Sequence, residues 1–203
     1  MELLLVRHAR PLRVESESGP ADPPLAPLGH RQTAALAAWL ADDAEAPITA
    51  VYTSPLRRAA ETADPLAGAL GLGTAVRDPA LAEYDAEALA YIPIEELQAA
   101  GDPRWREIPP DIETFAARDM EGVDRLCAAH PAQRVALVCH GGVINVIVSS
   151  VLGLGAQMLF LPGYTSVSRV LVASSGPRSL ASLNELGHLR VAGVPLTELS
   201  PPR

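Results

Sequence analysis

Three short runs dominated by apolar residues constrain the fold of this chain more than any other feature. They cover residues 2–6 (ELLLV), 48–54 (ITAVYTS) and 134–140 (RVALVCH), and a stretch with helical spacing follows each one along the chain. Strands that are apolar on both faces and alternate with helices are typical of a parallel sheet covered on two sides. We therefore predict one α/β domain over residues 1–203, an α/β/α sandwich with a mostly parallel central sheet.

The spacing of apolar residues also predicts the remaining elements. We expect helices at 28–43, from Pro55 to about Leu70, at 112–129 and at 141–153, and further strands at 74–76, 166–174 and 178–185. Pro55 suits the first turn of its helix, because that position needs no backbone N–H donor. The segments 10–27 and 78–110 are expected to be irregular, and the tail 200–203 to be frayed.

The composition excludes several classes of protein. Hydrophobic residues make up 48% of the chain and charged residues 20%, as in an ordinary globular domain. No apolar run approaches the roughly 20 residues of a membrane helix, and the N-terminus lacks the features of a signal peptide. We therefore expect a cytoplasmic protein with no membrane partner. The net charge of −8 argues against a nucleic-acid partner.

All 16 basic residues are arginine, and the absence of lysine removes two chemistries. A Walker-type phosphate loop needs a lysine that reaches the phosphates, and Schiff-base catalysis needs a lysine amine. Any phosphate handled by this chain must therefore be bound by arginine, histidine and backbone N–H groups.

Residues that can bind an anion follow each of the three apolar runs. Arg7 and His8 follow the first, Arg57 and Arg58 follow the second, and His140 with a pair of glycines follows the third. Each has an ordinary structural explanation, since a histidine at a strand end is commonly a partly buried, hydrogen-bonded side chain. Sites in such sheets form at the carboxyl ends of the strands, so the coincidence of three such ends predicts an anion site there.

Competing chemistries fail on spacing. A thiolate phosphatase loop that begins at Cys139 would need an arginine where Asn145 stands. A zinc site needs three or four closely placed ligands, whereas the five histidines are spread along the chain and form no His-x-x-x-His pair. No G-x-S-x-G turn of a serine hydrolase occurs. We therefore expect no metal and no cofactor.

Four segments together resemble the histidine phosphatase superfamily, which has the phosphoglycerate mutase-like fold. They read LLLVRHARP (3–11), LAPLGHRQTAAL (25–36), VYTSPLRRAAETA (51–63) and VALVCHGGVINVI (135–147), in the order and spacing of that family. The segment SLNELGHL (182–189) resembles the last strand of the family and extends the match over nearly the whole chain.

The resemblance implies a role for each of five residues. His8 matches the nucleophile that becomes phosphohistidine, and Arg7 and Arg58 match the arginines that bind phosphate. His140 matches the second histidine of the phosphate pocket, and Glu83 in LAEYD matches the proton donor. Because arginine and histidine already supply positive charge around the phosphate, the implied mechanism needs no metal.

The chain departs from the family pattern at two places. The usual G-x-x-E-G segment after the acid is replaced by EYDAEALAYIP, so Asp85 and Glu87 stay open as alternatives to Glu83. Arg10 stands where the family often has glutamate after a glycine. It is either a substrate contact at the mouth of the pocket or solvated, and we favour a solvated side chain.

The leading functional prediction is a phosphomonoester hydrolase that acts on a small phosphorylated substrate through a phosphohistidine. Two alternatives stay open: a phosphoglycerate mutase, and a non-catalytic module that binds a phosphorylated ligand. We expect the segments 10–27 and 78–110 to decide substrate specificity, and a homodimer is compatible with the sequence.

Overall fold

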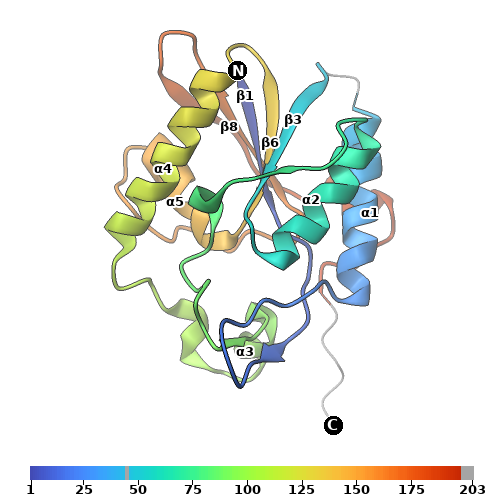
Figure 1. The fold of residues 1–203 in the computed structure, drawn as a ribbon, viewed down its shortest axis with the longest axis vertical. Coiled ribbons are helices and arrows are strands. Elements are labelled where there is room, and N and C mark those ends of the chain that lie inside the picture. The colour runs from blue at the N-terminus through green and yellow to red at the C-terminus, as the bar shows by residue number, and fades with distance from the viewer. Residues whose placement is uncertain (44–45, 198–203) are drawn as a thin grey trace.

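The computed structural model describes residues 1–43 and 46–197, and it contains a central six-stranded sheet (Figure 1). The order of strands across the sheet is β4-β3-β6-β1-β7-β8. Their bounds are β1 Glu2–Arg7, β3 Ile48–Thr53, β4 Val76–Arg77, β6 Arg134–Cys139, β7 Val167–Val172 and β8 Arg178–Glu185. The four strands from β4 to β1 are parallel, whereas β7 and β8 are antiparallel to their neighbours. The predicted α/β class with a mostly parallel sheet is confirmed.

Helices cover both faces of the sheet, as the apolar character of its central strands requires. The helices α1 (Pro27–Ala41) and α2 (Arg57–Ala69) lie on one face, and α4 (Ile112–Ala129) and α5 (Gly141–Val151) lie on the other (Figure 1). The strand β1 divides its side chains between two cores, with Leu3 and Leu5 in the core under α4 and α5 and Leu4 and Val6 in the core under α1 and α2. All four are fully buried, so β1 is held firmly from both sides.

The segments predicted to be irregular contain short regular elements. The strand β2 (Val14–Glu15) from the first segment pairs antiparallel with β5 (Ala90–Tyr91) from the second. The second segment also forms α3 (Ile94–Ala99) and two 3₁₀ turns, Pro79–Leu81 and Pro103–Arg106. The elements β2, β5 and α3 lie together beyond one end of the sheet, at the bottom of Figure 1. The prediction of irregular structure was wrong there, because elements of two to six residues carry no readable periodicity.

Two predicted boundaries also need correction. The helix α2 begins at Arg57 rather than at Pro55, because Leu56 is extended and donates its N–H to the Ser54 hydroxyl (3.2 Å), which forms a turn before the helix. The strand predicted at 74–76 is Val76–Arg77, since only there does the chain reach the end of β3 and pair with it. The tail 200–203 lies outside the described residues. Among residues 1–43 and 46–197, no helix is both long and apolar enough to span a bilayer.

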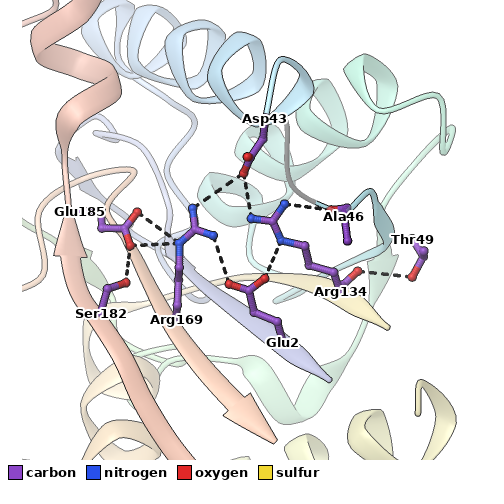
Figure 2. Close-up of polar contacts among 8 residues, drawn as sticks. All are labelled: Glu2, Asp43, Ala46, Thr49, Arg134, Arg169, Ser182 and Glu185. Carbon is purple, nitrogen blue, oxygen red and sulfur yellow. Dashed lines mark hydrogen bonds and ion pairs between the residues drawn. The ribbon is translucent and has the colours of Figure 1, made fainter. Parts of the chain in front are cut away.

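A network of charged side chains begins at the amino ends of β1 and β6 and extends across β7 to the end of β8 (Figure 2). Arg134, the first residue of β6, contacts Glu2 at the start of β1 (2.7 Å) and Asp43 after α1 (2.8 Å). Arg169 on β7 also contacts Glu2 (3.1 Å) and adds Glu185 at the end of β8 (3.0 Å). The two pairs of Glu2 join residues 132 and 167 positions apart in the chain, so the network links the start of the chain to β6 and β7.

Candidate functional site

The carboxyl ends of β1, β6 and β3 lie side by side, so the residues that follow them meet at one edge of the sheet. Arg7 pairs in register with Cys139, which places His8 next to His140, and their ring centroids are 5.1 Å apart. Arg58 lies in the first turn of α2, directly after β3. The structure therefore brings together the two histidines and two of the arginines that the sequence placed at strand ends.

His8 is almost fully buried, and its surroundings fix which ring nitrogen can react. Its Nδ1 lies 2.8 Å from the carbonyl oxygen of Ala9, which can only accept, so Nδ1 carries the proton and Nε2 keeps its lone pair. Burial, followed by the positive charges of Arg58 and Arg7, holds the pKa of His8 well below its ordinary value. The ring is therefore neutral at physiological pH and has a nucleophilic nitrogen.

The two arginines are buried, and only some of their N–H groups are hydrogen-bonded to described residues. Arg7 donates one N–H to the carbonyl oxygen of Pro162, and its guanidinium lies 4.1 Å from the centre of the Tyr164 ring. Arg58 donates to Asp85 (3.2 Å) and lies 4.6 Å from the centre of the Tyr91 ring. In the described part of the chain, the buried Nε atoms of both arginines have no hydrogen-bond partner. These donors are available to an anion that enters the site.

The ring of His140 is buried next to that of His8. It is 1% exposed, and neither of its ring nitrogens has a hydrogen-bond partner among the described residues. Burial, followed by the positive charge of Arg58 and by the nearness of His8, beside which a second charged imidazole would be repelled, keeps the pKa of His140 well below the ordinary value. Because buried polar atoms are nearly always hydrogen-bonded in folded proteins, an unpartnered imidazole beside two arginines indicates a binding position.

Glu83 is the acid that the resemblance predicts, and a glycine makes its position possible. Its Oε2 accepts the backbone N–H of Gly142 at the start of α5 (2.8 Å), and its Oε1 accepts the N–H of Tyr84 (3.1 Å). A Cβ atom at Gly142 would lie 2.3 Å from Oε1, so any other residue there would displace the carboxyl group. Burial, and then the charge of Asp85, raises the pKa of Glu83 to about 7. The group is therefore half protonated near neutral pH.

The two alternative acids, Asp85 and Glu87, are less well placed than Glu83 to donate a proton in the cavity. Asp85 lines the same cavity, but it is engaged as the partner of Arg58. Glu87 is exposed and does not line the cavity. The geometry thus favours Glu83 among the three carboxyl groups that the sequence left open.

Arg10 does not behave as predicted. Its guanidinium contacts Glu95 (2.7 Å) and Glu96 (3.3 Å) in the first turn of α3, and its side chain is 13% exposed. The expectation of a solvated side chain was wrong, because α3, which carries both glutamates, was not anticipated. Arg10 does not line the cavity either, so it ties α3 to the strand end instead.

The turn that follows the loop after α5 holds Arg7 and His8 in place, and sequence reasoning missed it. Thr165 donates its backbone N–H to the carbonyl oxygen of Arg7 (3.0 Å), next to the contacts that Pro162 and Tyr164 make with the Arg7 side chain. Thr165 has a φ of 58°, a strained value for a β-branched residue, and its hydroxyl contacts His188 (3.0 Å). The Pro-Gly pair at 162–163 signalled a turn, but not that the turn packs against the end of β1.

The site contains a cavity of about 420 Å³, and His140 is not among the described residues that line it. Arg7, His8, Arg58 and Glu83 line it, and it extends between residues 104–108 and 158–162. The arrangement can hold a small oxyanion on arginine donors, attack it with an imidazole nitrogen and deliver a proton from a carboxyl group. No group of three or more His, Cys, Asp or Glu residues within residues 1–43 and 46–197 is placed to hold a metal ion. Metal independence stays a prediction.

Comparison with known proteins identifies the relatives of this chain. The model of the histidine phosphatase superfamily (branch 1) matches residues 3–185. A curated protein of Mycobacterium tuberculosis, "Bifunctional protein Rv2228c", is 31% identical over 201 residues, which cover 92% of this chain and 54% of that protein. The chain therefore spans about half the length of this relative.

Two solved structures share the architecture. A mycobacterial glucosyl-3-phosphoglycerate phosphatase is 25% identical, with a TM-score of 0.70 over 90% of this chain and 98% of that one. The phosphoserine phosphatase of Entamoeba histolytica, solved with 3-phosphoglyceric acid, is 20% identical, with a TM-score of 0.71 over 93% of this chain and 98% of that one. The likeness to the second structure concerns the fold alone.

Proposed function

Because the chain belongs to the histidine phosphatase superfamily (branch 1), we propose that it hydrolyses phosphomonoesters through a phosphohistidine on His8. The observation that carries the proposal is the state of that ring, which is neutral, protonated on Nδ1 and free at Nε2 beside two arginines. The likeness to a glucosyl-3-phosphoglycerate phosphatase supports the same reaction class. The substrate is a phosphorylated small molecule, and no cofactor takes part.

In the first half of the reaction, Arg7, Arg58 and the N–H of His140 bind the phosphoryl oxygens and stabilise the charge that develops on them. Nε2 of His8 attacks the phosphorus atom in line with the ester oxygen, so the N–P bond forms while the P–O bond breaks. Glu83 gives its proton to that oxygen, and the product leaves as a neutral alcohol. A pKa of about 7 leaves enough of Glu83 protonated for this step.

In the second half, Glu83 acts as a base. Its carboxylate takes a proton from a water molecule while the water oxygen attacks phosphorus. The N–P bond breaks, inorganic phosphate leaves, and His8 regains the lone pair on Nε2. Glu83 is then protonated again and ready for the next ester.

The two alternatives find less support. A phosphoglycerate mutase has to grip a second anionic group, but Arg104 in the cavity is held by Asp102 (2.6 Å). A non-catalytic binding module needs neither a nucleophile nor an acid, whereas this chain offers a candidate for each, His8 and Glu83. A homodimer and a cytoplasmic location stay predictions.

The experiment is to trap the covalent intermediate. Enzyme mixed with ³²P-labelled ester and quenched in mild base should carry a label that survives base and is lost in acid. The His8→Ala variant should carry none and lose turnover, while the control variant His30→Ala, changed at an exposed histidine on α1, should behave as wild type. Activity should survive dialysis against EDTA.

Three outcomes would contradict the proposal. Near-full activity of His8→Ala would remove the phosphohistidine. Conversion of 3-phosphoglycerate to 2-phosphoglycerate, in the presence of a trace of 2,3-bisphosphoglycerate, much faster than phosphate release would favour the mutase. Binding of phosphate without turnover of any ester would favour the non-catalytic module.

A further inference from the structure

The cavity is larger than a phosphate group needs, and the residues that line it become more apolar with distance from the catalytic residues. Its volume of about 420 Å³ falls in the range of roughly 300–1,000 Å³ that is usual for sites of drug-sized ligands. Beyond the catalytic residues, large apolar and aromatic side chains dominate the lining: Tyr84, Tyr91, Trp105, Ile108, Met158 and Phe160. This part of the cavity is where the alcohol portion of a phosphomonoester would lie.

Several of these apolar side chains are exposed at the mouth of the cavity. Tyr84 is 47% exposed and Ile108 59%, and Leu159 and Leu161 on the opposite segment are 38% and 45% exposed. Large apolar side chains scattered singly over a surface need no explanation, but several around one opening indicate a binding site. Their exposure to water is unfavourable, and an apolar group that covers them removes this unfavourable contact.

One wall of the cavity is held in a fixed shape. Asn145 on α5 accepts the backbone N–H groups of Leu159 (2.6 Å) and Phe160 (3.0 Å), and its amide nitrogen donates to the carbonyl oxygen of Phe160 (2.9 Å). The backbone that presents Phe160 to the cavity is therefore ordered before a ligand arrives, which lowers the entropic cost of binding.

The charges in this part of the cavity do not favour a second anionic group. Arg104 is paired with Asp102, and the negative charge of Glu107 in the lining offsets the charge of Arg106, which lies over the ring of Trp105 (4.4 Å). A small phosphorylated acid would place its carboxylate among apolar side chains and lose hydration without gaining a dedicated partner.

We propose that the substrates are phosphomonoesters of alcohols that carry a bulky, apolar aromatic group, rather than small hydrophilic esters such as phosphoserine or 3-phosphoglycerate. This inference rests on the proposed phosphatase function. The phosphoryl group lies against Arg7 and Arg58, and the aromatic group packs against Trp105 and Phe160, where ring–ring contacts add to the burial of apolar area.

The test compares esters with similar leaving groups, so that they differ only in the part of the alcohol beyond the phosphorylated carbon. Phosphate release is measured for 2-(2-naphthyl)ethyl phosphate, ethyl phosphate, phosphoserine and 3-phosphoglycerate, all phosphorylated on a primary carbon. We expect kcat/KM for the naphthylethyl ester to exceed each of the others by about 10–100-fold, as burial of one large apolar group predicts. Equal or better hydrolysis of phosphoserine or 3-phosphoglycerate would overturn the inference, whereas no hydrolysis of any ester would overturn the proposed function itself.

Variants assign the preference to the cavity. Trp105→Ala and Phe160→Ala should each reduce the preference for the naphthylethyl ester over ethyl phosphate at least about fivefold. A circular dichroism spectrum and a Tm like those of wild type report that each variant is folded. The control Leu183→Ala changes an exposed leucine on β8 that does not line the cavity, and it should keep the full preference. An unchanged preference in both cavity variants would also overturn the inference.

Discussion

Buried arginines lie at both ends of the central sheet, but their surroundings differ. At the amino ends of the strands, Arg134 contacts Glu2 and Asp43 and also donates to the carbonyl oxygen of Ala46 (2.9 Å) (Figure 2). At the carboxyl ends, Arg7 contacts no carboxylate among the described residues, and Arg58 contacts only Asp85. Both arginines at this second end have a buried Nε without a partner in the described part of the chain.

The difference separates a structural use of arginine from a functional one. A buried charge whose donors are all paired stabilises the arrangement around it, and removing it leaves its partners unpaired. A buried charge with unused donors destabilises the empty protein and is stabilised when an anion binds. Substitutions at the two ends should therefore have opposite effects on activity and on stability.

The largest effect is expected for Arg58→Met. Loss of the guanidinium that stabilises the phosphoryl group should lower kcat/KM by about 10³–10⁵, the range measured for arginines in phosphoryl transfer. The free energy of unfolding, measured by urea titration without phosphate, should be unchanged or higher, because a partly unpaired buried charge has been removed. The control Arg57→Met changes the exposed neighbour, which pairs with Glu61, and should keep activity within about twofold. A large loss of stability in Arg58→Met would place this residue with the structural arginines.

The carboxyl groups extend the comparison, since Glu2 contacts two arginines whereas Glu83, among the described residues, accepts only backbone N–H groups. The pKa of Glu83 is raised to about 7, so its protonated form is present below about pH 7 and is lost as the pH rises. Wild-type kcat/KM on an alkyl ester reports the free enzyme and the first, proton-donating half of the reaction, so it should fall about tenfold per pH unit above that value. On the acid side it should hold well below pH 6.5, because the lowered pKa of His8 keeps that ring neutral.

Glu83→Gln tests this assignment. It should slow alkyl esters by about 10²–10⁴ and remove the alkaline decline, but slow activated aryl esters less, since their leaving groups need no proton. Glu87→Gln changes an exposed carboxyl group outside the cavity and serves as the control. Equal losses on both kinds of ester would indicate that Glu83 only supports the structure, and an unaffected variant would move the role to Asp85.

The two ends also differ in how far the sequence could predict them. Four candidate residues lie at or just after the ends of apolar strands: His8, Arg7, Arg58 and His140. The order of these strands in the sheet brings the four together, and the motifs at the strand ends mark them in the sequence. Glu83 could be placed only by resemblance, because its position depends on the close approach of Gly142. The charged network at the amino ends joins residues scattered over the whole chain, and no local pattern marks it.

The same limit applies to the walls of the cavity. Neither the pairing of β2 with β5 nor the helix α3 could be anticipated, because such short elements form only through contacts between distant segments. The error about Arg10 follows from this, since its partners Glu95 and Glu96 lie on α3. Substrate preference depends on these segments, and it is therefore the property that the sequence predicts least.

The smallest effect on activity is expected at the amino ends, for Arg134→Met. This change removes donors from Glu2 and Asp43 but leaves both carboxylates in contact with Arg169, at 3.1 and 3.8 Å. The free energy of unfolding should therefore fall by about 3 kcal/mol, the low end of the range for breaking a buried ion pair. For a chain of this length, such a loss lowers Tm by about 6–12 °C.

Because the network lies at the far end of the strands, kcat/KM of the folded variant should stay within about twofold of wild type. Arg13→Met, which removes an exposed arginine paired with Glu15, is the control and should leave Tm unchanged. A loss of activity in Arg134→Met as large as that in Arg58→Met, measured where both variants are folded, would show that the two ends are coupled and that the division between structural and functional arginines is wrong.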